Sequence, residues 1–595
     1  MGYFSYPLDT KVLLRKKLAI KKELLQQDIN WISKRVAVLG GSTTNEIVDQ
    51  LELALLHHGI HAEFYQSEYG KFWEDGMFGN STIDSFSPDI IYIHTNWRNI
   101  QVFPSMGDKP DDVDRLINDE YNRYMQLWQR LKEKFKCPII QNNFDRPEYR
   151  LMGNRDIWDY RGKSNFISRM NQKFYEYAQE QTAFFINDID YIAQSYGLTE
   201  WSDSLYWNMY KYMCPMNAIP YISLSVANII KSIFGKNKKL LALDLDNTIW
   251  GGVVGDDGVD GIKIGKEIPQ GQSYYAFQEY CKQLQQIGVV LAVDSKNDED
   301  NAMAGLKHPD GVLRPEDFVA IKANWLQKDQ NLRDMSDELS LGLDSFVFVD
   351  DNPAEREIVK KQLPDVAVPE ISSAENYITE IDRQGYFEVT ELSTEDLHKT
   401  DQYKARSAAR NAQAAFADYS EYLKSLEMKA VITGFEAISI GRISQLTNKS
   451  NQFNLTTKRC TEEDIRNMQE DKNYICLCGR LIDKFGDNGI VTVVAGEIID
   501  DALHIRLWLM SCRVLKRELE DVMMNVLVER AAEYGIKTII GYYYPTPKNS
   551  MVKEFYGDMG FILSSDDEDG NTSWKMEVAE YKLRDTQIGL DETGL

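Results

Sequence analysis

The sequence predicts a multidomain protein of the α/β class. Apolar runs with strand character alternate with helical patterns, and three of these runs end in Asp or Ser residues. Strands that alternate with helices are typical of parallel sheets covered by helices. The 595 residues provide length for about three or four domains, and the 43% hydrophobic content is ordinary for globular proteins.

The first functional signal is the run LLALDLDNTIW, residues 240–250. Its apolar half predicts a strand that delivers Asp244 and Asp246 to the strand end. Residues two apart share one face of a strand, so these carboxylates repel each other unless a cation or a shared proton compensates. Mg²⁺ prefers oxygen ligands, and a carboxylate can attack phosphorus to form an aspartyl phosphate. The competing interpretation is a strand end whose Asp residues only cap a turn.

Two further strands carry polar residues at their ends. VVLAVDSKND places Ser295 at one strand end, and SFVFVDDNPAERE places Asp350 and Asp351 at another. Between them, Lys322 and Lys328 precede the helical pattern QNLRDMSDEL. Ligands of parallel α/β sheets bind beyond the carboxyl ends of the strands, so we expect these side chains to converge in one crevice.

This set of motifs resembles the four motifs of the haloacid dehalogenase (HAD) superfamily of phosphotransferases. The resemblance implies a Rossmann-like parallel sheet with a minimal cap. It makes Asp244 the nucleophile, and Asp246 the acid that protonates the leaving group and the base that activates water. Ser295 would hydrogen-bond the phosphoryl oxygens, and a lysine would neutralise their charge. Lys328 is our choice for that lysine because the helix begins directly after it, and Lys322 is the alternative.

The same resemblance implies a Mg²⁺ site. Asp350 and Asp351 would help to hold the ion, together with Asp244 and the main-chain carbonyl of Asp246. Positioning and charge compensation supply most of the catalysis in phosphoryl transfer, and these roles are consistent with that chemistry.

The segments DNTIWGGVVGDDG, DSKND, IKANW and FVFVDDNPAERE, with RISQLTNKSNQFNLTTKR further on, resemble the FkbH-like branch of the superfamily. That resemblance implies an enzyme that takes a glyceryl group from 1,3-bisphosphoglycerate, removes its phosphate, and loads the three-carbon acyl unit onto the phosphopantetheine thiol of an acyl carrier protein. The alternative is a stand-alone phosphatase of a small phosphorylated metabolite, with flanking domains that only bind.

The composition of the chain argues against some classes of binding partner. A formal net charge of −25 argues against a nucleic-acid partner and against anionic membranes. The segment LLRKKLAIKKELLQQ is a candidate basic patch for a carrier protein, but a solvated amphipathic helix packed on the first domain is the simpler explanation and the one we prefer. The sequence contains no run of eighteen apolar residues and no signal pattern, and its seven cysteines suit a reducing compartment. We therefore expect a cytoplasmic protein.

Two polar segments predict the domain boundaries. They are GKNKK at residues 235–239 and a charged connection at residues 388–406. We expect a first domain over residues 1–235, a HAD-like domain over 236–387 and a third domain over 400–580.

The first domain resembles SGNH hydrolases. The strand RVAVLGG is followed by Ser42 and Thr43, and the strand PDIIYIHTNW ends at Asn96. The family's D-x-x-H base motif has its best match at Asp203, with Tyr206 in place of histidine. Serine is a weak nucleophile without a base, so we expect a degenerate domain that binds or docks. Ser42, Thr43 and the amides of the following helix could bind an anion.

The third domain resembles GNAT acyltransferases, because strands, a long helix, another strand and NSMVKEFYGDMGF follow in that order. The pyrophosphate turn R/Q-x-x-G-x-G/A is matched by Arg513-Val-Leu-Lys516-Arg-Glu518, in which both glycines are replaced. Ordinary acetyl-CoA binding is therefore doubtful, while Arg513 and Lys516 remain candidates for pantetheine recognition. Cys512 is a candidate acyl acceptor or a structural thiol. Tyr556 is a candidate acid for the departing thiolate or a core residue.

Overall fold

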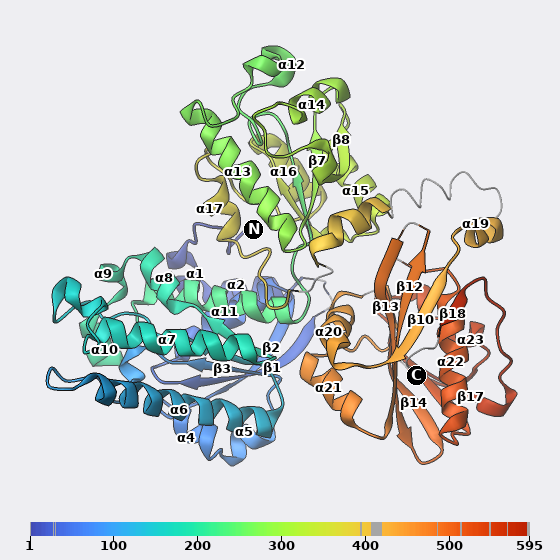
Figure 1. Cartoon of the computed structure of the whole chain (residues 1–595), viewed down its shortest axis with the longest axis horizontal. Helices are drawn as coiled ribbons and strands as arrows, with labels where there is room; N and C mark the ends of the chain where they lie inside the picture. Colours follow the sequence, from blue (N-terminus) through green and yellow to red (C-terminus); the bar gives the residue numbers. More distant parts are fainter. Residues whose placement is uncertain are drawn as a thin grey trace. The chain divides into compact units, whose positions relative to one another are not determined.

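The computed structural model describes residues 2–591 apart from 28, 30, 393–395, 406–418, 451, 485, 512, 513, 547, 548 and 568. The chain divides into two compact units: the first contains Met1–Phe234 and the short segment Thr461–Asp464, and the second contains the remaining residues. Three sheets organise it, two of them wholly parallel and one mixed (Figure 1). The predicted α/β class is thereby confirmed, while the domain boundaries read from the sequence stay a prediction.

The first unit contains a parallel sheet with the strand order β2-β1-β3-β4-β5. Its strands are β1 Ile32–Gly40, β2 Ile60–Gln66, β3 Ile90–His94, β4 Ile139–Asn142 and β5 Phe184–Asn187. Its helices are α1 Thr10–Arg15, α2 Lys17–Leu25, α3 Asn45–His57, α4 Phe72–Met77, α5 Ser81–Phe86, α6 Pro110–Phe135, α7 Lys163–Glu180, α8 Ile189–Tyr196, α9 Leu198–Trp201, α10 Ser204–Tyr210 and α11 Ile219–Ile233.

Helices cover both faces of this sheet, and the side chains of each strand point alternately into two separate cores. Val36 and Val38 of β1 join a core with residues of α3 and α11. Ala37 and Leu39 join a second core with residues of α6 and α7. The strands therefore read as continuous apolar runs, and polar residues follow at their carboxyl ends.

The second unit begins with a parallel sheet of order β8-β7-β6-β9. Its strands are β6 Leu240–Leu243, β7 Val290–Ser295, β8 Phe318–Ala323 and β9 Phe346–Val349. Its helices are α12 Val254–Asp257, α13 Pro269–Gln286, α14 Glu299–Leu306, α15 Lys328–Leu339, α16 Pro353–Gln362 and α17 Tyr377–Asp382.

The register of this central sheet positions the candidate site. Leu243, the last residue of β6, pairs with Val293 of β7 and with Val349 of β9. The residues that follow these three positions therefore lie side by side at the carboxyl edge of the sheet. Between β6 and α13 lie the short α12, a 3-10 turn at Val259–Gly261 and two isolated bridges, Asp246 with Trp250 and Gly251 with Lys263, so the insertion after the first strand is small.

The mixed sheet has the order β16-β17-β15-β14-β13-β12-β10-β18, and β11 pairs with β14. Its strands are β10 Lys429–Gly434, β11 Phe453–Asn454, β12 Tyr474–Asp483, β13 Gly486–Ile499, β14 Ala502–Met510, β15 Thr538–Tyr543, β16 Ile562–Asp566, β17 Thr572–Glu577 and β18 Gly589–Asp591. Its helices are α19 Tyr419–Ser425, α20 Ile440–Lys449, α21 Glu462–Glu470, α22 Leu519–Glu533 and α23 Phe555–Asp558.

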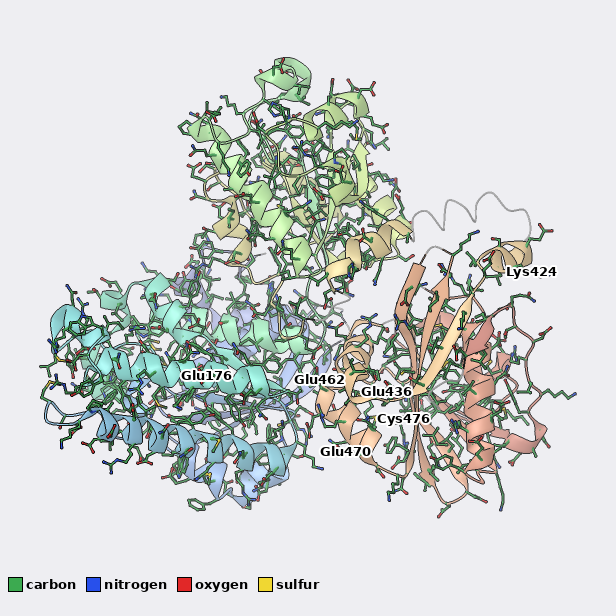
Figure 2. The ribbon with its side chains drawn as sticks, in the orientation of Figure 1. Glu176, Lys424, Glu436, Glu462, Glu470 and Cys476 are labelled. Carbon is green, nitrogen blue, oxygen red and sulfur yellow. The ribbon has the colours of Figure 1, made fainter. Side chains whose placement is uncertain are left out.

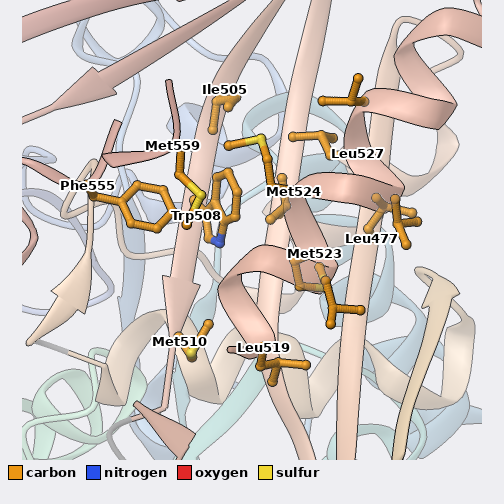
Figure 3. Close-up of a cluster of buried hydrophobic side chains, with 14 of the residues drawn as sticks. Leu477, Ile505, Trp508, Met510, Leu519, Met523, Met524, Leu527, Phe555 and Met559 are labelled. Carbon is orange, nitrogen blue, oxygen red and sulfur yellow. The ribbon is translucent and has the colours of Figure 1, made fainter. Parts of the chain in front are cut away.

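Strands β12, β13 and β14 form an antiparallel meander, and β15 runs parallel to β14 after the crossover through α22. A methionine-rich core lies against α22, where Trp508 packs among Met523, Met524 and Met559 (Figure 3). On β12, the thiol of Cys476 lies 3.6 Å from the carbonyl oxygen of Met468 in α21 (Figure 2).

Candidate active site

A cavity of about 380 Å³ opens at the carboxyl ends of the central strands. It is lined by Asp244, Asp246, Asn247, Ser295, Lys296, Lys328, Asp350, Asp351, Asn352, Pro353 and Glu355. The structure thus brings together every residue that the sequence predicted for the phosphoryl site, from three strand ends and one helix start.

Asp244 occupies the floor of this cavity. Its backbone N–H donates to the carbonyl of Val349 at 2.9 Å, which continues the β6–β9 pairing by one residue, and its side chain is buried. Asn247 then adopts a left-handed conformation with φ of 54°, so the chain turns sharply after Asp246. A polar residue such as Asn tolerates this conformation better than a branched one would.

Lys328, the first residue of α15, is buried beside two carboxylates. Its Nζ donates to Asp244 Oδ1 at 2.7 Å and also to Asp350 Oδ2. Burial by itself lowers the pKa of Lys328, but the two carboxylates outweigh burial and the net shift is upward. Lys328 is therefore a fixed cation at the cavity floor.

Lys322 has different surroundings. Its Nζ pairs with Glu338 at 2.8 Å, and it does not line the cavity. The sequence favoured Lys328 over Lys322 because a helix begins beside it, and this geometry agrees with that choice. The catalytic role of Lys328 stays a prediction.

Three carboxylates form a candidate metal centre. Oxygen atoms of Asp244, Asp350 and Asp351 lie within 4.8 Å of one another, which makes them the cluster among the described residues that could hold a metal ion. Burial, and then the charges of Asp244 and Asp350, raise the pKa of Asp351 to about 6. This mutual repulsion and the all-oxygen donor set fit a hard divalent cation such as Mg²⁺.

The carboxylate of Asp246 accepts three hydrogen bonds from donors outside the carboxylate cluster. It accepts hydrogen bonds from Trp250 Nε1 at 2.8 Å, from Val254 N at 3.0 Å and from Asn297 Nδ2 at 3.0 Å. It is not part of the carboxylate cluster, so its predicted contribution to the metal site rests on its main-chain carbonyl. The sequence reasoning missed Trp250 and Asn297, which lie inside the quoted motifs DNTIWGG and DSKND.

Arg356 and Thr248 hold the loop after β9. The buried guanidinium of Arg356 donates to the carbonyl oxygens of Asp350 at 2.7 Å and Asp351 at 2.9 Å. The backbone N–H of Asp351 donates to Thr248 Oγ1 at 3.2 Å, which ties this loop to the loop after β6. The motif DDNPAERE contains this arginine, but its role depends on a loop geometry that spacing does not give.

A further buried carboxyl lies on β7. Asp294 accepts from Asn331 Nδ2 at 2.9 Å through Oδ1, while its Oδ2 has no partner among the described residues. Burial, together with the charges of Asp244 and Asp350, raises the pKa of Asp294 to about 8. A carboxyl group with this pKa is mostly protonated at pH 7.

The predicted sites of the third domain are only partly described. Cys512 and Arg513 lie outside the described residues. Lys516 and Glu518 adopt left-handed conformations with φ of 62° and 65°. These are the positions where the resemblance expects glycine, and such conformations cost about 1 kcal/mol or more in other residues. Tyr556 is fully buried and burial raises its pKa, which matches the core interpretation of this residue.

The D-x-x-Y match in the first domain caps a helix. Asp203 accepts from the backbone N–H of Tyr206 at 2.8 Å and so forms the N-cap of α10.

A solved structure that contains a phosphatase domain is similar to a large part of this chain. The N-terminal part of protein BF1531 from Bacteroides fragilis, which contains a phosphatase domain complexed with Mg, is 29% identical to this chain. The match has a TM-score of 0.58 and covers 63% of this chain and 99% of that one. This chain is therefore similar, over more than half of its length, to a protein that contains a phosphatase domain.

A family model matches part of the first unit. Residues 35–231 match the model of the FkbH N-terminal domain, and the resemblance to the FkbH-like family read from the sequence is confirmed. Comparison with curated proteins returns no match.

Solved N-acetyltransferases resemble a smaller part of the chain. The ribosomal-protein-S18-alanine N-acetyltransferase from Escherichia coli matches with 11% identity and a TM-score of 0.20, over 25% of this chain and 94% of that one. The spermidine N-acetyltransferase from Vibrio cholerae, in complex with CoA and spermine, matches with 9% identity and a TM-score of 0.22, over 26% of this chain and 98% of that one. No helix in the described ranges is long and apolar enough to cross a membrane.

Proposed function

We propose that the central domain catalyses Mg²⁺-dependent phosphoryl transfer with Asp244 as the nucleophile. The observation that supports this most directly is the cavity in which Asp244 accepts a hydrogen bond from Lys328 and lies within 4.8 Å of carboxylate oxygens of Asp350 and Asp351. A phosphatase with bound Mg is among the structural relatives. A cavity that contains one buried cation and several buried carboxylates suits a substrate that arrives with a metal-bound phosphoryl group.

In the first step, an oxygen of Asp244 attacks phosphorus. The bond between phosphorus and the leaving oxygen breaks, and an aspartyl phosphate forms. Asp246 gives a proton to the leaving oxygen. Ser295 and Lys328 hydrogen-bond the phosphoryl oxygens and compensate their charge.

In the second step, Asp246 takes a proton from water, and the resulting hydroxide oxygen attacks the aspartyl phosphate. The bond between Asp244 and phosphorus breaks, inorganic phosphate leaves, and the Asp244 carboxylate is restored. The three hydrogen bonds from Trp250, Val254 and Asn297 keep the Asp246 carboxyl in one orientation for both proton transfers.

Asp244, Asp350 and Asp351 would hold Mg²⁺, with the main-chain carbonyl of Asp246 as a further ligand. When bound, the ion neutralises negative charge on the phosphoryl oxygens and on the carboxylates around it.

The substrate that fits the FkbH-like resemblance is a phosphorylated three-carbon acyl donor such as 1,3-bisphosphoglycerate. The Asp244 site would remove the phosphate ester of this donor. The phosphopantetheine thiol of an acyl carrier protein would attack the carbonyl carbon of the acyl phosphate, so that a thioester forms and the acyl phosphate group leaves as inorganic phosphate. Cys512, Arg513 and Lys516 are candidate participants in this transfer. The support for this finer proposal is the family match over residues 35–231.

The alternative is a stand-alone phosphatase whose flanking domains only bind. Two observations favour it: Lys516 and Glu518 replace the glycines of the pyrophosphate turn, and Tyr556 is too deeply buried to meet a departing thiolate without movement.

One experiment separates these possibilities. The full chain is incubated with Mg²⁺, 1,3-bisphosphoglycerate and holo acyl carrier protein, and the carrier is weighed by mass spectrometry while phosphate release is measured. Loading predicts a glyceryl adduct on the holo carrier and none on the apo carrier, and Cys512→Ala tests the relay. Phosphate release without any adduct supports the stand-alone phosphatase. Full phosphate release by Asp244→Asn would contradict both.

A further inference from the structure

The central cavity has room for more of a substrate than its phosphoryl group. Its volume of about 380 Å³ lies in the range of about 300–1,000 Å³ that is usual for small-molecule sites. The proposed phosphoryl transfer uses the floor of the cavity, where Asp244 and Lys328 meet the carboxylate cluster. The lining residues without a role in that chemistry are Asn247, Lys296, Asn352, Pro353 and Glu355. These residues, the wall of the cavity, are available to the part of a substrate that is not transferred.

A second lysine of the cavity belongs to this wall. Lys296 follows Ser295 directly at the end of β7, and its Nζ donates to Glu355 Oε1 at 2.6 Å. Its side chain is 31% exposed, whereas that of Lys328 is 3% exposed. Lys328 is therefore enclosed beside Asp244, while Lys296 is open to an incoming group. Because an ammonium has three N–H donors, Lys296 can keep its carboxylate partner and still donate to a second anion.

The partner of Lys296 has an unused acceptor. Glu355 lies in the first turn of α16. Its Oε1 receives the bond from Lys296, but its Oε2 is buried and has no hydrogen-bond partner among the described residues. A carboxylate oxygen that is buried and unpaired costs free energy, so its presence at a cavity wall indicates a ligand that donates a hydrogen bond. A hydroxyl group of a substrate is such a donor.

The amide side chains of the wall already have structural partners. Asn247 Oδ1 accepts from the backbone N–H of Gly252 at 2.9 Å, and Asn352 Oδ1 accepts from that of Ala354 at 2.9 Å. These two side chains hold the loops after β6 and β9 in shape, as Asn side chains commonly do in turns and caps. The ion pair between Lys296 and Glu355 therefore offers the wall's open ammonium and its unused carboxylate oxygen.

The charges of the cavity make Lys296 important for any substrate with a second anionic group. Two lysines and five carboxylates line the cavity, and the carboxylates are those of Asp244, Asp246, Asp350, Asp351 and Glu355. Carboxylates repel an anionic group unless a cation lies next to it. In the proposed phosphoryl transfer, Lys328 compensates the charge of the phosphoryl oxygens. Lys296 is then the lining cation that remains for a second anionic group.

We propose that Lys296 and Glu355 form a subsite that selects the substrate of the central domain. Lys296 binds an anionic group, such as a carboxylate, on the part of the substrate that is not transferred. Glu355 Oε2 accepts a hydrogen bond from a hydroxyl group beside that anionic group. The substrate class is therefore a phosphate ester of a short hydroxy acid. This inference rests on the phosphoryl transfer proposed for the same cavity, and it assigns substrate selection to two residues that take no part in that chemistry.

The test compares phosphate release from three esters by the full chain with Mg²⁺. The ester 3-phosphoglycerate carries a carboxylate and a hydroxyl, glycerol 3-phosphate lacks the carboxylate, and 3-phosphonooxypropanoate lacks the hydroxyl. The readout is the ratio of the kcat/KM values of two esters in the same variant. A general loss of folding, of bound metal or of catalytic power affects both esters alike and cancels in this ratio. An ion pair that only ties β7 to α16 would therefore leave the ratio unchanged.

We expect each variant to lower one ratio. Lys296→Met should lower the preference for 3-phosphoglycerate over glycerol 3-phosphate by about tenfold or more, through KM, and Lys296→Arg should retain part of it. Glu355→Met should lower the preference for 3-phosphoglycerate over 3-phosphonooxypropanoate by about fivefold or more. Both of these esters carry the carboxylate, so a change at Lys296 cancels. Lys322→Met is the matched control, because Lys322 pairs with Glu338 and does not line the cavity, and it should keep both ratios within about twofold.

A fourth compound, p-nitrophenyl phosphate, has neither the carboxylate nor the hydroxyl, so its hydrolysis reports the proposed phosphoryl transfer alone. The inference is overturned, and the proposed function stands, if the wild type cleaves this compound but shows no preference among the three esters. The same holds if either variant keeps the ratio that it should lower. If the wild type releases phosphate from none of the four compounds, or if Asp244→Asn releases it as fast as the wild type, the proposed function fails and this inference fails with it.

Discussion

Asp294 provides a quantitative test of the central site's electrostatics. The group is 0% exposed, and its pKa of about 8 stands far above the ordinary value of 3.8. Below about pH 4 the carboxyl is protonated in both the folded and the unfolded chain. Between about pH 4 and pH 8 the unfolded chain releases the proton and the folded chain keeps it, so stability falls as pH rises.

The size of this loss of stability follows from the difference between the pKa values of Asp294 in the folded and the unfolded chain. Each pH unit between the two pKa values costs about 1.4 kcal/mol, which places an upper limit of about 4 kcal/mol on the penalty at pH 7. Asp294→Asn keeps the shape of the side chain and the acceptor for Asn331, but it cannot ionise. We therefore expect this variant to be more stable than the wild type by a few kcal/mol at pH 8, and by no more than about 2 kcal/mol near pH 5.

Urea unfolding at pH 5, 6, 7 and 8, followed by circular dichroism in the presence of a chelator, measures this difference. Asp310→Asn, at an exposed carboxylate, is the matched control and should stay within about 0.5 kcal/mol of the wild type. Phosphate release by Asp294→Asn at pH 7 should remain within a few-fold of the wild type, because the charge at this position does not change. A stability difference that is independent of pH would show that Asp294 is ionised in the folded protein, and the reasoning would be wrong.

Three further outcomes are expected. Lys328→Met should lower kcat/KM for phosphate release at least about 100-fold, whereas Lys322→Met should change it less than about threefold; equal losses would contradict the assignment from geometry. Trp250→Phe removes the indole donor to Asp246. This variant should lower kcat about tenfold and shift the pH–rate profile, with no loss of melting temperature. An unchanged pH–rate profile would count against a positioning role for Trp250. Because Asp351 must lose a proton of pKa about 6 to bind a cation, Mg²⁺ affinity measured by titration should fall up to about tenfold for each pH unit below 6, and a flat affinity between pH 5 and 7 would refute this.

The strand ends of the central site could be read from the sequence because they depend on local patterns. Apolar runs followed by Asp244, Ser295 and Asp350 predict buried parallel strands, and parallel strands present their carboxyl ends at one edge of a sheet. That rule is enough to gather the site residues without knowledge of the register.

Other parts of the site depend on side chains that meet across the fold. The bonds from Trp250 and Asn297 to Asp246, and the support that Arg356 gives to the loop after β9, have no sequence period. The separation of Lys328 from Lys322 likewise depends on where α15 begins and on the partner that Glu338 offers to Lys322.

By itself, the sequence determined the α/β class, the strands that carry the catalytic motifs and the resemblance to the FkbH-like family, because hydrophobic periodicity and motif order are properties of neighbouring residues. Only the tertiary structure decided which lysine stands beside Asp244, that burial raises the pKa of Asp294, and that Ser42 Oγ and Asn96 Nδ2 are buried without a hydrogen-bond partner among the described residues. These facts depend on burial and on partners distant in the chain, and desolvation acts on a group only after the fold has removed it from water.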